Sequence, residues 1–163
     1  MTRIVLHIDM DAFFAAIEER DNPQFRDLPI VVGADPLGGR GRGVVSTANY
    51  VARKYGIHSA MPITWAYRAN PKAIFLPVDM KRYVAVSRNI MAVLRTYANK
   101  MEQVSVDEAY LQPTVNSIQQ AAKIAQKIKK KIWEKEKLTC SIGIGPSKMI
   151  AKIASGENKP NGL

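Results

Sequence analysis

The order of apolar segments restricts this chain to few folds. Outside residues 12–79, apolar periodicity predicts strands at 3–9, 101–106, 109–112 and 138–144 and helices at 80–98, 117–136 and 147–155. If residues 12–79 form an insertion, the remaining chain begins strand, helix, strand, strand, helix, strand. This is the order of the ferredoxin-like split βαβ fold. The sequence therefore predicts an α+β protein built on a ferredoxin-like βαββαβ sheet.

The inserted segment is predicted to form a small α/β subdomain. Its expected elements are helices at 12–20 and 49–55 and strands at 30–34, 44–47 and 73–77. Glycines and prolines interrupt it, most densely in the run GGRGRG. That run lacks the Gly-Lys-Ser/Thr sequence of a phosphate-binding P-loop, so we interpret it as a flexible surface loop. We interpret the inserted segment as a lid.

Composition indicates an intracellular, soluble protein. A chain of 163 residues that is 47% hydrophobic can bury its own core. Its single cysteine, Cys140, lies in an apolar alternation and is expected to be a small core residue, which favours a reducing compartment such as the cytoplasm. Neither a signal peptide nor a run of ~20 apolar residues is present, so we expect no membrane association.

The charge balance favours a polyanionic partner. The net charge is +10 and the pI is about 9.8, values typical of proteins that bind nucleic acid. Many of the lysines fall in the predicted helix 117–136, whose apolar residues recur at helical spacing and leave the lysines on the outer face. That face is either a solvated surface or a DNA contact.

Two acidic clusters follow predicted buried strands. Asp9 and Asp11 lie in HIDMDAFF, and Asp107 and Glu108 lie in VSVDEAY. In the predicted topology the first strand lies beside the hairpin of the second and third, so Asp9 and Asp107 should meet at one edge of the sheet. Carboxylates brought together in this way repel one another unless a cation lies between them. The sequence therefore predicts a divalent-cation site, and Mg²⁺ prefers such oxygen ligands.

We expect Asp9, Asp107 and Glu108 to bind the metal, together with the backbone carbonyl of Met10. Asp107 and Glu108 can reach one site only if the chain bends, which a hairpin turn allows. Asp11 could face the same site or cap the helix that follows it, and we favour the cap.

Phosphoryl transfer explains why such a site would need two metal ions. A nucleoside triphosphate brings about four negative charges to the three carboxylates, and two Mg²⁺ ions nearly offset either set. Tyr50, Arg53 and Lys54 lie on the predicted helix 49–55, where they could donate hydrogen bonds to the triphosphate. His7 and His58 have no partner at metal-ligand spacing, and we assign them no role.

Four blocks of sequence resemble the Y-family lesion-bypass DNA polymerases of the DinB type. They are HIDMDAFFAAIEERDNPQ, GVVSTANYVARKYGIHSAMPI, VSVDEAYL and SIGIGPSKMIAKIASGENKPNGL. The resemblance implies that residues 1–11 and 80–163 form the catalytic palm and residues 12–79 the fingers. It also implies a template-directed, low-fidelity polymerase that adds dNTP to a primer 3′ end. The chain stops just after KPNG, so we expect the thumb and the C-terminal DNA-binding domain to be absent.

The resemblance also implies roles for single residues. Asp9, Asp107 and Glu108 would bind two catalytic Mg²⁺ ions, assisted by the Met10 carbonyl. Phe14 would be the steric gate that excludes a ribose 2′-hydroxyl. The other implied contacts are with the incoming nucleotide: Thr47, Tyr50, Arg53 and Lys159 at the triphosphate, Phe13 beside the nucleotide through its backbone, and Ser46 over the nascent base pair.

The implied partners are primer-template DNA, dNTP and, through regions outside this chain, a sliding clamp, with the protein itself a monomer. One departure from the family pattern is Gln112 with Pro113 after DEAYL, and we expect the strand to end there or to lie at an edge, since proline cannot donate to a sheet. Two other functions remain open. A nucleotidyl cyclase would use a similar palm and two metals without a template. An RNA-recognition module would need exposed aromatic residues on its central strands, and the segment QVSVDEAYL contains only Tyr110.

Overall fold

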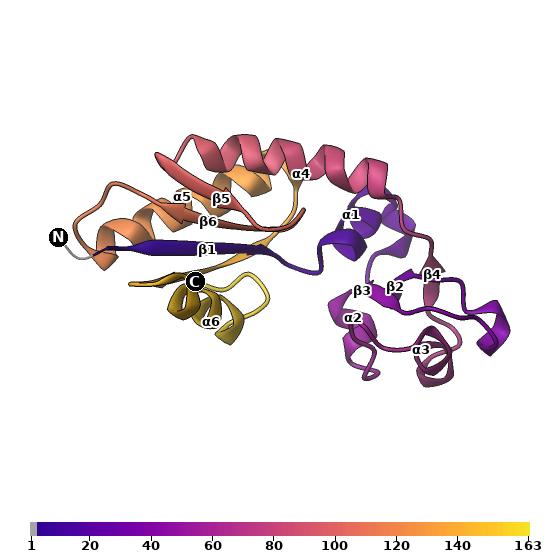
Figure 1. Cartoon of the computed structure of the whole chain (residues 1–163). Helices are drawn as coiled ribbons and strands as arrows, with labels where there is room; N and C mark the ends of the chain where they lie inside the picture. Colours follow the sequence, from indigo (N-terminus) through magenta and orange to yellow (C-terminus); the bar gives the residue numbers. More distant parts are fainter. Residues whose placement is uncertain (1–2) are drawn as a thin grey trace. The chain divides into compact units, whose positions relative to one another are not determined.

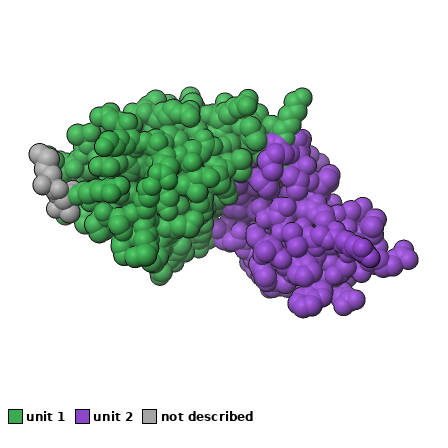
Figure 2. All heavy atoms as spheres, viewed as in Figure 1, with its two compact units in different colours: residues 1–11, 81–163 green, residues 12–80 purple. Residues whose placement is uncertain are grey.

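The computed structural model describes residues 3–163 as two compact units. The first unit combines the chain up to Asp11 with Lys81–Leu163, and the second consists of Ala12–Met80 (Figure 2). No helix within residues 3–163 is long and apolar enough to cross a membrane.

The first unit is built on a four-stranded antiparallel sheet in the order β5-β6-β1-β7. Its elements along the chain are β1 (Val5–Met10), α4 (Met80–Arg95), β5 (Lys100–Gln103), β6 (Glu108–Gln112), α5 (Ile118–Glu136), β7 (Cys140–Gly145) and α6 (Lys148–Glu157). From β1 to β7 this is the order strand, helix, strand, strand, helix, strand. The predicted ferredoxin-like fold is therefore confirmed.

Helices cover both faces of this sheet. In Figure 1, α4 and α5 lie on one face and α6 on the other. Side chains alternate along β1, so Leu6, Ile8 and Met10 face α4 and α5, and all three are buried. His7 and Asp9 face the side of α6. The core beneath α4 and α5 thus fixes β1, and the opposite face is left to carry polar groups.

Glycines allow α6 to lie close against β7. A Cβ atom at Gly143 would lie 1.9 Å from the carbonyl oxygen of Ala151, and one at Gly145 would lie 2.8 Å from the amide nitrogen of the same residue. No side chain fits at either position. The SIGIG sequence therefore brings the backbone of α6 onto the sheet, and the polar residues of α6 come within reach of those on β1.

The second unit contains a three-stranded sheet in the order β3-β2-β4. Its regular elements are α1 (Phe13–Asp21), β2 (Ile30–Gly33), β3 (Val45–Ala48), α2 (Tyr50–Arg53), α3 (Ile63–Ala69) and β4 (Ile74–Leu76), with short 3₁₀ turns at Pro23–Phe25 and Leu37–Gly39. Strand β2 pairs antiparallel with β3 and parallel with β4. Buried aliphatic residues of β2, β3, α2 and α3 form a core of its own.

Several sequence expectations need correction. The acidic pair 107–108 does not end a buried strand, because β5 is largely exposed, a turn follows it, and Glu108 begins β6. The expected helix 49–55 is only four residues long, and α3 was not foreseen. Asp11 does not cap α1, whose N-cap is Ala12 with no side-chain hydrogen bond.

Two smaller expectations are confirmed. Strand β6 ends at Gln112, directly before Pro113. Cys140 is a core residue, only 1% exposed, and burial raises the pKa of its thiol to about 12. This cysteine therefore remains a protonated thiol at neutral pH.

Candidate active site

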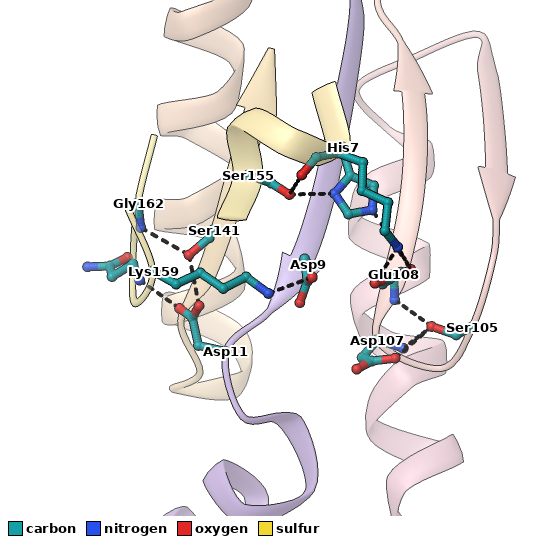
Figure 3. Close-up of polar contacts among 12 residues, drawn as sticks. His7, Asp9, Asp11, Ser105, Asp107, Glu108, Ser141, Ser155, Lys159 and Gly162 are labelled. Atoms are coloured by element: carbon teal, nitrogen blue, oxygen red, sulfur yellow. Dashed lines mark hydrogen bonds and ion pairs between the residues drawn. The ribbon is translucent and has the colours of Figure 1, made fainter. Parts of the chain in front are cut away.

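The two acidic clusters meet where β1 ends and β6 begins. Asp9 on β1 lies directly opposite Glu108 on β6 in the antiparallel register. The amide of Met10 donates to the carbonyl of Asp107 at 3.0 Å, which joins the end of β1 to the turn before β6. The predicted convergence of Asp9 with the 107–108 pair is thus confirmed (Figure 3).

A serine fixes the turn that carries Asp107. The hydroxyl of Ser105 donates to Asp107 Oδ1 at 2.6 Å. The oxygen of this hydroxyl accepts a hydrogen bond from the backbone amide of Glu108 at 3.1 Å. The hydroxyl thus orients one carboxylate and holds the backbone of the next acidic residue. Ser105 was not predicted as a site residue, although its position two residues before Asp107 is typical of a serine that stabilises a turn.

Two lysines neutralise two of the three carboxylates. Lys159 Nζ lies 2.6 Å from Asp9 Oδ2, and Lys152 Nζ lies 2.9 and 2.8 Å from the two oxygens of Glu108. The family resemblance predicted Lys159 as a triphosphate contact, whereas Lys152 was missed. Its place on α6, four residues before a glycine, carries no signal for a partner on β6.

Burial and these ion pairs shift pKa values in opposite directions. Burial raises the pKa of Asp9, and the hydrogen bond from Lys159 only partly offsets it. Burial would also raise the pKa of Glu108, but the hydrogen bonds and charge of Lys152, together with smaller electrostatic contributions from His7 and Lys159, outweigh it and lower that pKa below its ordinary value. The pKa of Lys152 is raised in turn, first by its hydrogen bonds to Glu108. Glu108 and Lys152 therefore both remain charged at neutral pH.

His7 lies buried beside this pair. Its Nδ1 is 2.7 Å from the hydroxyl of Ser155, which also lies 2.8 Å from the carbonyl of Lys152. A hydroxyl has one hydrogen, so if Ser155 donates to that carbonyl, its oxygen accepts the hydrogen of His7 Nδ1. His7 Nε2 then carries the lone pair, has no hydrogen-bond partner, and lies 3.9 Å from Glu108 Oε2. Burial lowers the pKa of His7, so the ring is neutral at neutral pH.

These acidic groups are oxygen ligands of the kind that Mg²⁺ binds, but each has another partner in this structure. Within residues 3–163, no three acidic, imidazole or thiol groups converge at metal-binding distance. Lys159 binds Asp9 and Ser105 binds Asp107 (Figure 3), and Lys152 binds Glu108. Carboxylate oxygens are the ligands that Mg²⁺ prefers, and in this structure lysine ammonium groups lie beside two of the three carboxylates.

The remaining candidate residues lie in the second unit. Phe13 and Phe14 begin α1, with ring centroids 5.9 Å apart. Phe13 is 2% exposed, while Phe14 is only partly buried. Phe14 is thus the one of the two whose ring can be reached by a ligand.

Strand β3 and helix α2 carry the other predicted contacts. Ser46 and Thr47 are partly buried on β3. The guanidinium of Arg53 lies over the ring of Tyr50, 4.6 Å from its centroid, and Arg53 Nε donates to the carbonyl of Ala48 at 3.0 Å. Arg53 is exposed, and this packing fixes its planar head group while leaving other N–H groups available for an anion.

Known proteins resemble the chain closely. The profile of the impB/mucB/samB family matches residues 8–156. DNA polymerase IV 2 of Methanosarcina mazei is 57% identical over 163 residues, which cover 99% of this chain and 44% of that protein. DNA polymerase IV of Methanoculleus marisnigri is 52% identical, with 99% of this chain and 45% of that protein covered. The corresponding protein of Streptococcus mutans is 50% identical over 99% of this chain and 44% of its own length.

Solved structures agree with these sequence matches. An insertion ternary complex of Dbh DNA polymerase superposes with a TM-score of 0.91 at 43% identity, covering 98% of this chain and 47% of that one. DinB from Sulfolobus solfataricus superposes with a TM-score of 0.90 at 44% identity over the same shares. The chain thus spans less than half the length of the proteins it matches.

Proposed function

Since the chain belongs to the impB/mucB/samB family, we propose that it is the palm and fingers portion of a Y-family lesion-bypass DNA polymerase. The first unit would be the palm, and residues 12–80 would be the fingers. The observation that carries this proposal is the pairing of Asp9 with Glu108 across β1 and β6, with Asp107 on the adjoining turn. The relatives named DNA polymerase IV support it.

The proposed reaction is template-directed transfer of a nucleotide. The oxygen of the primer 3′-hydroxyl forms a bond to the α-phosphorus of a dNTP, while the bond from that phosphorus to the bridging oxygen breaks. Pyrophosphate leaves, and the hydroxyl proton passes to water. The chain's task is to hold the two reacting groups in line and to offset the charge that accumulates between them.

Asp9, Asp107 and Glu108, with the Met10 carbonyl, would hold two Mg²⁺ ions. When bound, the ions would lower the pKa of the 3′-hydroxyl and offset the charge of the phosphates. For these carboxylates to turn to the ions, Lys159 would leave Asp9 and Lys152 would leave Glu108. Lys159 would then be free to contact the triphosphate, so that its ammonium group remains beside negative charge in both states.

The second unit would receive the nucleotide. Arg53 and Tyr50 would bind the triphosphate together with Thr47, and Ser46 would lie over the nascent base pair. A serine leaves space there, which would let damaged bases enter and would reduce discrimination between correct and incorrect pairs. Phe14 would lie beneath the sugar, with the backbone of Phe13 beside the nucleotide.

We propose primer-template DNA and dNTP as the partners, and an intracellular monomer as the working form. A sliding clamp would bind through regions outside this chain. The basic composition supports a nucleic-acid partner, because +10 charges favour contact with phosphates.

The carboxylate assignment can be tested by primer extension. Asp107→Ala should abolish Mg²⁺-dependent extension by the 163-residue chain, because it removes one proposed ligand, and EDTA should abolish extension by the wild type. Asp21→Ala, a change at an exposed aspartate of α1, is the matched control and should extend normally. Undiminished extension by Asp107→Ala would contradict the assignment of Asp107 as a metal ligand. Turnover of nucleotide without primer-template DNA would instead indicate a cyclase.

The steric gate can be tested separately. Phe14→Ala should admit ribonucleotides, because the ring proposed to exclude the 2′-hydroxyl is removed. The measurement is the ratio of ribonucleotide to deoxynucleotide incorporation, which should rise on the order of 100-fold if the gate contributes about 3 kcal/mol of discrimination. An unchanged ratio would remove this role from Phe14.

A further inference from the structure

Asp11 is buried next to the proposed active site and binds a loop far away in the sequence. Its side chain is only 3% exposed. The hydroxyl of Ser141 on β7 donates to Asp11 Oδ1 at 2.8 Å, and the backbone amide of Asn161 donates to Oδ2 at 2.8 Å. One oxygen of this carboxylate therefore binds Ser141 on β7 (Figure 3), and the other binds the chain that follows α6.

A second set of bonds fixes the same loop. The amide of Gly162 donates to the Ser141 hydroxyl oxygen at 3.1 Å, and its carbonyl accepts from the amide of Ile142 at 3.1 Å. Lys129 Nζ donates to that carbonyl as well, at 2.9 Å. Residues 161–162 are thus held against β7 from both their amide and their carbonyl groups.

The backbone of the loop has a restricted shape. Asn161 has a φ of 58°, in the left-handed region that asparagine tolerates better than most residues. A Cβ atom at position 162 would lie 2.5 Å from the carbonyl oxygen of Asn158, so only glycine fits. The loop 158–162 therefore folds back on itself, and Asp11 binds it at the point where it does so.

Lys159 lies in this loop and reaches Asp9. Its Nζ is 2.6 Å from Asp9 Oδ2, while Asp11, two residues further along the chain, holds the amide of Asn161. Two side chains of the segment 9–11 thus bind the loop. Asp9 binds the side chain of Lys159, and Asp11 binds the backbone of Asn161. A carboxylate taken out of water is retained only where donors replace the lost hydration, and here those donors are the groups that fix the loop.

We propose that Asp11 is a positioning residue that acts through Lys159. By holding residues 161–162, its carboxylate keeps the Lys159 ammonium group at the edge of the carboxylate site, where it pairs with Asp9 and then with the triphosphate. Asp11 itself touches neither metal nor nucleotide. The inference rests on the proposed function, because it assigns Asp11 a part in binding dNTP.

The test compares Asp11→Ala with Asp11→Asn in the 163-residue chain. Alanine removes both acceptors, and we expect the Kd for Mg²⁺·dATP, measured by calorimetric titration, to rise about tenfold, the scale seen when supporting groups around a site are removed. Asparagine should restore most of the affinity, because its oxygen can accept from Asn161 and its amide can donate to Ser141. If Asp11→Ala does not fold, Ser141→Ala is the substitute variant. It removes the donor to Asp11 Oδ1 and the acceptor of the Gly162 amide but leaves Asp11 bound to Asn161, so it should also weaken binding.

A double mutant distinguishes positioning from general destabilisation. If Asp11 acts through Lys159, Asp11→Ala should weaken binding no further in a Lys159→Met chain, whereas independent effects would multiply. Multiplied losses, or an Asp11→Asn chain as weak as Asp11→Ala, would overturn the inference.

Amide hydrogen exchange provides a readout that does not depend on nucleotide. In Asp11→Ala the amides of Asn161 and Gly162 should exchange at least about tenfold faster, while those of β6 (Glu108–Gln112), which pairs with β1, keep their protection. Unchanged exchange at residues 161–162 would overturn the inference even if the wild type binds no nucleotide. Failure of the wild type to bind Mg²⁺·dATP would contradict the proposed function instead.

Discussion

Lysines pair with two of the three acidic residues that converge at the end of β1. Lys152 binds both oxygens of Glu108, whose side chain is 20% exposed, and Lys159 binds Asp9. Each pair joins α6 or the loop after it to the central strands. These ion pairs therefore help to hold α6 and the loop after it against the sheet.

The Glu108–Lys152 pair should make part of the stability dependent on pH. Since Lys152 lowers the pKa of Glu108 below its ordinary 4.5, the stabilisation is present above pH 4.5 and is lost as the pH falls through the folded value. Lys152→Met should therefore lower the free energy of unfolding at pH 7 by about 0.5–1 kcal/mol, the scale for partly exposed ion pairs. Urea denaturation at pH 7 and pH 3 measures the difference, which should shrink at the lower pH.

Lys135→Met is the control, because that lysine is exposed on α5. It should change stability by much less at both values of pH. If Lys152→Met loses as much stability at pH 3 as at pH 7, the ion pair is not the cause, and the destabilisation must come from the packing of the lysine stem.

The sequence allowed the acidic residues at this site to be predicted, but not their partners. Strand order predicted that Asp9 meets the 107–108 pair. It did not predict that Glu108, and not Asp107, lies directly opposite Asp9, because strand order does not determine register. The contacts of His7, Ser155 and Lys152 could not be predicted, since they depend on how α6 lies on the sheet, and residues on one helix face have no fixed register against a strand. For Asp11, the local rule for helix caps favoured the wrong partner, because two donors from distant segments bind its carboxylate instead.

At the scale of elements, the approach of α6 to β7 determines the geometry of the site. Helix α6 supplies Ser155 and Lys152, and the loop after it supplies Lys159. The sequence predicted the strand and the helix within a few residues. The close approach is explained by Gly143 and Gly145, and such glycines in a strand can equally indicate a bulge or a flexible segment when only the sequence is known.

Two glycine substitutions test this packing, and they should have opposite effects. In Gly143→Ala the new Cβ would lie 1.9 Å from the carbonyl oxygen of Ala151, so α6 must shift, and the free energy of unfolding should fall by about 3 kcal/mol. At Gly156, within α6, a Cβ meets nothing within 4 Å. Gly156→Ala should therefore raise stability by about 0.5–1 kcal/mol, since alanine favours a helix.

Chemical denaturation of both variants measures these changes in the free energy of unfolding. Gly156→Ala is a matched control, because both substitutions add the same methyl group. Because a shift of α6 would also displace Lys152, Gly143→Ala should in addition lose primer extension, whereas Gly156→Ala should retain it. Equal stability of the two variants would show that α6 does not depend on the glycines for its approach.

At the scale of the whole molecule, the candidate functions are divided between two units with separate cores. The carboxylates and their lysines belong to the first, whereas Phe14, Tyr50 and Arg53 belong to the second. Each set of candidate residues therefore lies within its own unit. The ferredoxin-like order of strands and helices could be recognised from the sequence only after residues 12–79 were treated as an insertion. Helix α3 was missed because its sequence, ITWAYRA, is short and weakly periodic.

The net charge of the whole chain leads to a prediction about DNA binding. With +10 charges the 163-residue chain should bind primer-template DNA through phosphate contacts, and each neutralised phosphate releases counterions. If about three phosphates are neutralised, the slope of log K against log salt should be about −2.7. Affinity should then fall about 40-fold between roughly 50 and 200 mM NaCl, which fluorescence anisotropy with a labelled duplex can measure.

A chain with Lys127→Gln, Lys130→Gln and Lys131→Gln tests whether α5 contributes, because these lysines are exposed on that helix. If α5 contacts DNA, the slope should become less negative by nearly one for each phosphate that is no longer neutralised. An unchanged slope would assign the lysines of α5 to a solvated surface and leave the phosphate contacts to basic groups elsewhere in the chain. Binding that does not weaken with salt would contradict an electrostatic interaction altogether, since counterion release is unavoidable when lysines neutralise phosphates.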